Sequence, residues 1–321
     1  MRLATSAAAL LLAAALATPA AAQTRVTLKS AASSSSYYVM MVQIGEALKE
    51  ATKGEITATV EESQGSVQNV KEAGKRPGNF IFTTPPSLLA DAKAGKKPFE
   101  GETGYDRVRT LFVVPAVTVH LAVRADSGVQ SVMDLAGKDF LGGGKGTFCE
   151  RAMGAIFKAF DLAGKVNVID VELSQASAAV KNRKVAGYAT CSSHPTPQLQ
   201  ELATTTAMRL VSFTPEQQKQ VLALDPSYGP ITIAKGTYKG IDADVETVGL
   251  PVGGYATTDM PDEVAYRVTK VFWERRAEMA KVNAWWNGID ARMVGLLQAK
   301  LHPGAARYYK EAGVTLPAAM N

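Results

Sequence analysis

The sequence predicts an α/β fold in two lobes, with two mostly parallel sheets that are flanked by helices and joined by crossing hinge strands. Strand-like and helix-like segments alternate along the chain, a pattern typical of parallel sheets. About 300 residues follow a leader segment, and a single core stops growing near that size. Two long β-type runs, Val113–Val123 and Thr247–Thr257, are long enough to cross between lobes. We therefore expect one lobe from residues 24–120 and 250–321 around an inserted lobe from residues 121–249.

The first lobe is expected to begin with a strand at Arg25–Lys29, a serine-rich loop and a helix at Tyr38–Thr52. The apolar residues of that helix recur every three or four positions, which indicates one buried face. Lys53-Gly54 is a typical helix end. The pattern next predicts a strand at Ile56–Val60, a helix at Ser66–Ala73, a strand at Phe80–Phe82 and a surface loop at Lys93–Gly104.

The inserted lobe is expected to repeat this alternation. A glycine run separates a short strand that begins at Asp139 from a helix over Phe148–Leu162. A strand at Val166–Leu173, a helix at Gln175–Lys181 and a strand at Val185–Thr190 follow. After the second crossing strand, the pattern predicts two C-terminal helices, at Pro261–Ala284 and Ile289–Lys300.

The first 22 residues have the pattern of a secretory signal peptide. Met1-Arg2 is a short basic start, Ala7–Ala17 is an apolar segment, and Ala20-Ala21-Ala22 supplies an Ala-x-Ala cleavage site. An uncleaved membrane anchor is the alternative. No later stretch reaches about 18 apolar residues without a charge. We expect cleavage near Ala22 and an exported, soluble mature chain.

Composition and charge exclude several classes of function. The net charge of +5 is spread over scattered Lys and Arg residues without a basic run, so nucleic acid is not an expected partner. His120, His194 and His302 have no neighbour at a metal-ligand spacing. The chain has no Gly-x-Ser-x-Gly motif. We expect no catalytic residues, no metal and no cofactor.

The glycine run Gly142-Gly143-Gly144-Lys145-Gly146-Thr147 is the strongest local signal. Its residue order fits neither the phosphate loop of nucleotide hydrolases nor the dinucleotide fingerprint. Glycines that leave N–H groups uncovered before a helix N-terminus do favour a small anion. Lys145 is the sharpest candidate for an ion pair with that anion. The alternative is that Lys145 is a solvated surface charge.

Polar residues in other loops are expected to gather at the same place, because ligands of parallel sheets bind beyond the carboxyl ends of the strands. One or two serines of the run at 33–36 are accounted for by helix capping, and the tyrosine pair that follows is more often part of a core. The candidate ligand-binding residues are Ser33, Ser34, Ser35, Ser36, Tyr37, Tyr38, Gln64, Ser66, Asn69, Thr83, Lys145, Gly146, Thr147, Ser192 and His194.

Five segments in order resemble the TAXI family, the solute-binding proteins of a class of TRAP transporters. Ser30–Tyr38 is similar to the family's Thr-Gly-Gly-Thr-Gly-Gly-Thr-Tyr-Tyr, and Gly65–Asn69 matches its Gly-Ser-x-x-Asn. Gly144–Thr147 corresponds to its Gly-Ser-Gly-Thr, and Pro195–Pro197 matches its Pro-Thr-Pro. His302–Gly313 is similar to its closing motif. The resemblance covers nearly the whole mature chain.

The resemblance implies a type II-like periplasmic binding protein, monomeric and non-enzymatic, that closes on a small organic anion. Family ligands are amino acids such as glutamate, or dicarboxylates, which are delivered to TRAP membrane subunits. The chain departs from the family where Ala31, Ala32, Ser34 and Ser35 replace glycines and where Lys145 replaces a serine. An exported enzyme and a ligand-sensing domain for a small carboxylate are the alternatives.

Cys149 and Cys191 are the only cysteines of the chain. An oxidising compartment favours a disulfide between such a pair. In a doubly wound strand order, the strand that Cys191 ends lies beside the strand before the glycine run, which brings the two residues to one edge. Two buried free thiols are the alternative, and the sequence leaves both open.

Overall fold

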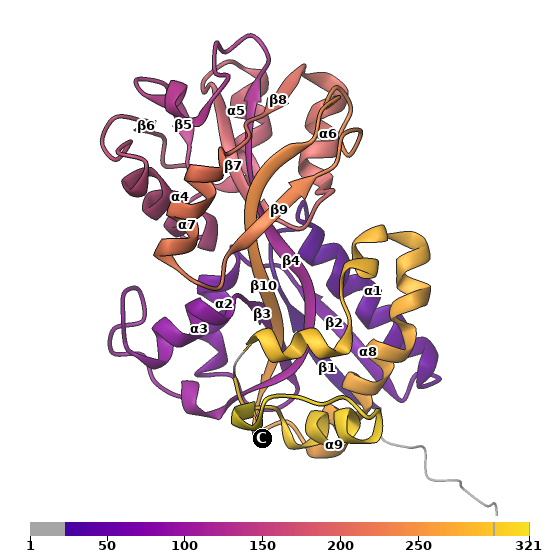
Figure 1. Ribbon diagram of the computed structural model, residues 1–321. Helices are drawn as coiled ribbons and strands as arrows, with labels where there is room; N and C mark the ends of the chain where they lie inside the picture. Colours follow the sequence, from indigo (N-terminus) through magenta and orange to yellow (C-terminus); the bar gives the residue numbers. More distant parts are fainter. Residues whose placement is uncertain (1–22, 298, 321) are drawn as a thin grey trace, which may run out of the picture.

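The computed structural model describes residues 23–297 and 299–320, so the predicted signal peptide lies outside the described residues. The molecule has two halves connected by two long strands (Figure 1). These strands are β4 (Val108–Arg124) and β10 (Val245–Thr257), which pair with each other in antiparallel register. We call residues 23–117 and 250–320 the lower half, and residues 118–249 the upper half.

The lower half carries the strand order β2-β1-β3-β10-β4. Strand β1 (Thr24–Lys29) is parallel to β2 (Ile56–Glu61) and to β3 (Phe80–Thr84), while β3 is antiparallel to β10. The helices of this half are α1 (Ser36–Ala51), α2 (Ser66–Ala73), α3 (Pro86–Lys93), α8 (Asp262–Val282) and α9 (Pro303–Glu311).

The upper half continues the same sheet as β4-β7-β5-β6. Its strands are β5 (Asp139–Leu141), β6 (Asn167–Val168), β7 (Gly187–Ser192), β8 (Met208–Leu210), which pairs with β4, and β9 (Gly229–Ile233), which pairs with β10. Its helices are α4 (Phe148–Ala159), α5 (Ala176–Lys181), α6 (Pro197–Thr205) and α7 (Pro215–Leu224).

The predicted α/β architecture of helices around a sheet is confirmed, but the two predicted sheets form one mixed sheet. A strand that carries the chain out of the lower half and a strand that brings it back must run in opposite directions. Because β4 and β10 hydrogen-bond to each other and to strands on both sides, they join both halves and add antiparallel pairs.

Several predicted elements differ from the structure. The strand predicted at Val166–Leu173 is reduced to Asn167–Val168, whose side chains are exposed at the sheet edge, and the helix predicted at Ile289–Lys300 is a 3-10 segment, Ala291–Leu297, that contains a glycine. Four short helices lie outside the predicted elements: α3, α6, α7 and α9. Each carries proline in its first turn, which is a recognised helix-start signal.

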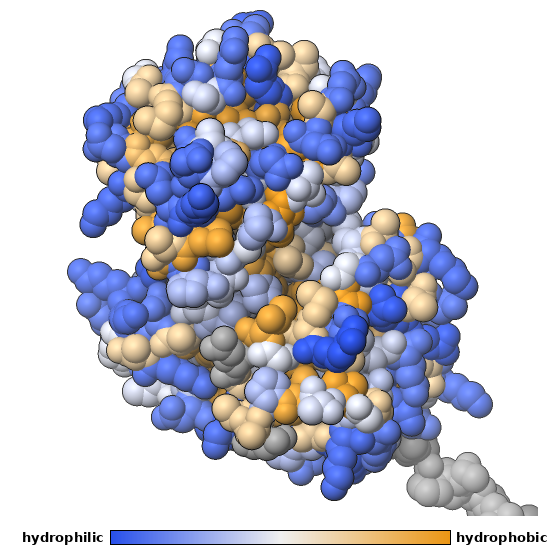
Figure 2. Space-filling view, viewed as in Figure 1, coloured by the Kyte–Doolittle hydropathy of each residue, from blue (hydrophilic) through white to orange (hydrophobic). Residues whose placement is uncertain are grey.

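Buried apolar side chains form separate clusters in the two halves. The lower cluster includes Phe112, Phe272 and Trp286. The rings of Phe112 and Phe272 are stacked, with their centroids 4.1 Å apart. The upper half has one cluster around Phe140 and another around Tyr188. Each fully buried large apolar side chain stabilises its half by about 1.5–3 kcal/mol. On the face shown in Figure 2, both halves are mostly hydrophilic, while hydrophobic residues are visible at the waist between them.

Candidate functional site

A cavity of about 350 Å³ lies where loops of the two halves meet. The lower half contributes the loops that follow β1, β2 and β3, and the upper half contributes the segments that follow β5, β6 and β7. These are the carboxyl ends of the parallel strands, where α/β sheets bind ligands. The lining residues are Ser30, Ala31, Ala32, Ser34, Ser35, Tyr37, Glu62, Ser63, Gln64, Gly65, Ser66, Gln68, Thr83, Pro85, Val117, Thr147, Phe148, Cys149, Glu172, Leu173, Ser174, Thr190, Cys191, Ser192, Thr196, Gln198 and Val252.

Five helices begin at this cavity, because the N-cap residues of α1, α2, α3, α4 and α6 all line it. These residues are Ser35, Gly65, Pro85, Thr147 and Thr196. The first N–H groups of a helix have no partner within the helix, and each N-terminus carries roughly half a positive charge. The N-caps of α2 and α3 supply no side-chain cap, whereas at the start of α6 Pro197 has no N–H and the Gln198 N–H is donated to the Ser34 carbonyl oxygen. The cavity therefore combines a positive potential with available N–H donors.

The two halves are hydrogen-bonded to each other beside the cavity. The Ser36 hydroxyl donates to the Ser193 carbonyl oxygen at 3.0 Å and accepts from the Ser192 hydroxyl at 2.6 Å. The Gln198 N–H donates to the Ser34 carbonyl oxygen at 3.3 Å. Within the lower half, the Tyr37 hydroxyl donates to the Pro115 carbonyl oxygen at 2.9 Å, and burial raises the pKa of this phenol above its ordinary value. Most of the serine run therefore caps α1 or joins the halves.

Asn69 lies behind the cavity wall and fixes two of its loops. Its side-chain amide donates to the carbonyl oxygen of Ser30 at 2.6 Å and to that of Thr83 at 3.1 Å. The hydroxyls of Ser30 and Thr83 also bond to each other, at 2.5 Å. Asn69 is fully buried and does not line the cavity, so it acts as a positioning residue.

The glycine run makes the tight turn that its composition predicts. Gly143 and Gly144 have φ angles of 110° and 84°, and a Cβ on Gly144 would lie 2.6 Å from Leu173. Thr147 caps α4 by accepting from the Glu150 N–H at 3.0 Å. A Cβ on Gly146 would lie 3.4 Å from the side-chain oxygen of Gln64, so the run approaches the lower half at the cavity edge.

The structure places Lys145 away from the cavity. Its side chain is 65% exposed, and its ammonium group lies 3.2 Å from the carboxylate of Asp170, which is 57% exposed. The turn between Gly144 and Gly146, both of which have positive φ, leaves this side chain at the surface. These surroundings fit the alternative in which Lys145 is a solvated surface charge. Lys145 does not line the cavity, so the positive potential there comes from the helix N-termini.

The remaining candidates divide between lining residues and their supports. Those that line the cavity are Ser34, Ser35, Tyr37, Gln64, Ser66, Thr83, Thr147 and Ser192. Those that do not are Ser33, Ser36, Tyr38, Asn69, Lys145, Gly146 and His194. His194 instead bonds through Nδ1 to the Thr118 hydroxyl at 2.9 Å, and burial lowers its pKa.

The polar lining residues outside the predicted set include Glu62, Glu172 and Gln198. Glu62 directly follows β2, so the strand-end rule that selected Gln64 applies to it as well. Glu172 was assigned to the strand that is mostly absent, and Gln198 lies in the first turn of an unpredicted helix.

A buried hydrogen-bond chain holds the N-terminus of α6 in place. The Tyr238 hydroxyl accepts from the Thr196 N–H at 3.0 Å and donates to Nε2 of His120 at 3.0 Å. Nδ1 of His120 donates to the Thr118 carbonyl oxygen at 3.0 Å. Burial lowers the pKa of His120 to about 3, so this imidazole stays neutral, as its acceptor role requires.

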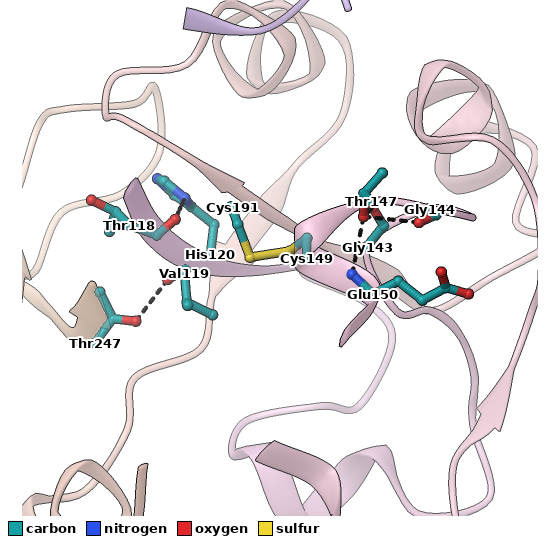
Figure 3. Close-up of a disulfide and its surroundings, with 10 residues drawn as sticks. All are labelled: Thr118, Val119, His120, Gly143, Gly144, Thr147, Cys149, Glu150, Cys191 and Thr247. Atoms are coloured by element: carbon teal, nitrogen blue, oxygen red, sulfur yellow. Dashed lines mark hydrogen bonds between the residues drawn. A yellow bond between two sulfur atoms is a disulfide. The ribbon is translucent and has the colours of Figure 1, made fainter. Parts of the chain in front are cut away.

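Cys149 and Cys191 form a disulfide whose Cα atoms are 5.3 Å apart. It joins the first turn of α4 to the end of β7, beside the hydrogen bonds of Thr147 (Figure 3). Both cysteines line the cavity. The bridge therefore connects two of the wall segments in the upper half.

Neither a metal centre nor a membrane span is found in the part of the chain that the structure describes. Residues 23–297 and 299–320 contain no group of three or more His, Cys, Asp or Glu side chains placed to hold a metal ion. None of the helices in these ranges is both long enough and apolar enough to cross a membrane.

Solved structures of periplasmic binding proteins have the same fold. An R. palustris protein solved with adipate is 15% identical, with a TM-score of 0.58 over 92% of this chain and 99% of that one. MatC from Rhodopseudomonas palustris, solved with malate, is 10% identical, with a TM-score of 0.57 over 89% and 98%. The periplasmic binding protein BugD is 15% identical, with a TM-score of 0.56 over 91% and 99%. The model of the NMT1-like family matches residues 28–313, and the chain belongs to this family.

Proposed function

We propose that this protein is an extracytoplasmic solute-binding protein that captures a small organic carboxylate between two lobes. The observation that carries the proposal is the meeting of five helix N-termini at one cavity between the halves. Such termini hold an oxyanion by N–H donors and dipoles without a cationic side chain. Structures of this fold solved with adipate and with malate support the same ligand class.

Capture works by lobe closure. The lobes are residues 24–120 with 250–321, and residues 121–249, and β4 and β10 are the hinge strands that connect them. Each half keeps its own buried cluster, so each moves as a body while the two strands bend. The contacts of Ser36 with Ser192 and Ser193 hold the closed state. The protein is a monomer without a cofactor or catalytic residue.

The partner of the loaded protein is the membrane part of a TRAP-type transporter, as the resemblance to the TAXI family implies. The ligand class includes amino acids such as glutamate and dicarboxylates. Export to the periplasm by the signal peptide at residues 1–22 places the protein where such a transporter collects its substrate.

A ligand screen tests this function. Thermal-shift assays against organic acids and amino acids identify ligands, calorimetry gives the stoichiometry, and NMR of the denatured complex identifies the released molecule. We expect one ligand per chain, released unchanged. Conversion of a ligand into a product contradicts the proposal, and so does a screen in which no carboxylate binds.

A further inference from the structure

The charges that line the cavity are all negative. None of the lining residues named above is Lys, Arg or His, and two of them are glutamates. Glu62 comes from the lower half and Glu172 from the upper half. A ligand enclosed between the halves is therefore flanked by one glutamate of each half, besides the helix N-termini.

Within the described residues, neither glutamate has a cationic partner. Glu62 accepts one hydrogen bond, from the Ser33 N–H at 2.9 Å, through one of its two oxygens. Its neighbour Glu61 is the reverse case: it binds Arg76 at 2.6 Å and lies 3.6 Å from Lys29, and these cations lower its pKa. The cations at this edge of the sheet are thus directed to Glu61 and away from the cavity.

Unpaired carboxylates beside a ligand decide which ligands are accepted. A second carboxylate on the ligand would approach Glu62 or Glu172 and be repelled, more strongly after closure has excluded water. An ammonium group would form charge-assisted hydrogen bonds with the same oxygens. The helix N-termini already provide for one oxyanion.

We propose that the ligand is an amino monocarboxylate, whose carboxylate meets the helix N-termini and whose ammonium group meets Glu62 and Glu172. This inference rests on the proposed function and narrows its ligand class. It makes the two glutamates specificity-determining residues that favour amino monocarboxylates over diacids of the same size.

Matched ligands separate the two ends of the site. The first set is 5-aminopentanoate, pentanoate and glutarate, which have five carbons and end in an ammonium, a methyl and a carboxylate group. Pentylamine keeps the ammonium group and lacks the carboxylate. The second set is glutamine and glutamate. Calorimetry near pH 7.5 keeps the amines protonated and the acids ionised. We expect the amino monocarboxylate of at least one set to bind at least ten-fold more tightly than its diacid.

Near-isosteric variants assign the selectivity to the two glutamates. Glu62→Gln and Glu172→Gln each remove one charge, and we expect each to weaken the amino monocarboxylate about ten-fold and to strengthen the diacid. Glu46→Gln, on an exposed position of α1, is the matched control and leaves both affinities unchanged. Thermal melting of every variant shows that it is folded.

Each outcome bears on one claim. Diacids that bind as tightly as their amino partners in both sets overturn the inference and leave carboxylate capture intact. Folded glutamine variants with the selectivity of the wild type overturn it as well. If pentylamine binds as tightly as 5-aminopentanoate, the carboxylate group of the ligand contributes nothing to binding. That result contradicts the proposed function.

Discussion

Removing the disulfide between Cys149 and Cys191 tests how the cavity wall is held. The bridge closes a sequence separation of 42 residues, and in the chain-entropy model such a loop stabilises the folded state by about 4 kcal/mol. We expect the double variant Cys149→Ala, Cys191→Ala to lose about that free energy of unfolding. Urea denaturation measures it: with an m value near 3 kcal/mol/M, the midpoint falls by about 1.3 M.

The same change is expected to weaken ligand binding, because the bridge fixes the first turn of α4 against the end of β7 at the cavity. Wild-type protein treated with reductant should behave like the double variant, and the double variant should not respond to reductant. A double variant within about 1 kcal/mol of the wild type refutes the reasoning, as do two reactive thiols per chain in the denatured, unreduced protein.

Three further predictions concern single side chains. Tyr238→Phe removes the hydroxyl that is the buried hydrogen-bond partner of the Thr196 N–H and of His120. We expect the free energy of unfolding to fall by about 1–3 kcal/mol and calorimetry to show weaker ligand binding. Unchanged values contradict the role of this hydrogen-bond chain. Burial lowers the pKa of His120 from 6.5 to about 3, so between these pH values the unfolded chain binds a proton at His120 and the folded chain does not. The free energy of unfolding should therefore fall as the pH drops from 6.5 towards 3. In urea denaturation at several pH values, His120→Gln should flatten this slope, and an unchanged slope contradicts the prediction. Lys145→Ala removes only an exposed ion pair with Asp170, so we expect less than a three-fold change in affinity, and a loss of ten-fold or more would return the lysine to the site.

The sequence was sufficient for the alternation of elements and for the two crossing strands. Apolar periodicity located the helix at Ser36–Ala51, and the long β-type runs located β4 and β10. Four helices, α3, α6, α7 and α9, escape prediction because each is short and has few apolar residues on one face, so that a proline in the first turn is their main signal. The single mixed sheet follows from strand pairing between distant segments, which local patterns do not encode.

The location of the site was more predictable than the role of each side chain. The strand-end rule gathered Gln64, Ser66, Thr83 and Thr147 at one cavity. It could not tell that Asn69 supports the loops from behind, because hydrogen-bond partners depend on packing. It also could not tell that the Lys145 side chain lies at the surface, because the direction of a side chain in a turn depends on the φ angles of the glycines around it.

A crystal structure with the tightest carboxylate from the ligand screen tests the central claim most directly. The account predicts one molecule between the halves, with its carboxylate oxygens about 2.7–3.2 Å from backbone N–H groups at the starts of the helices that Gly65 and Thr147 cap. A carboxylate bound by Lys145 at the surface, or a ligand outside the cavity, would contradict it.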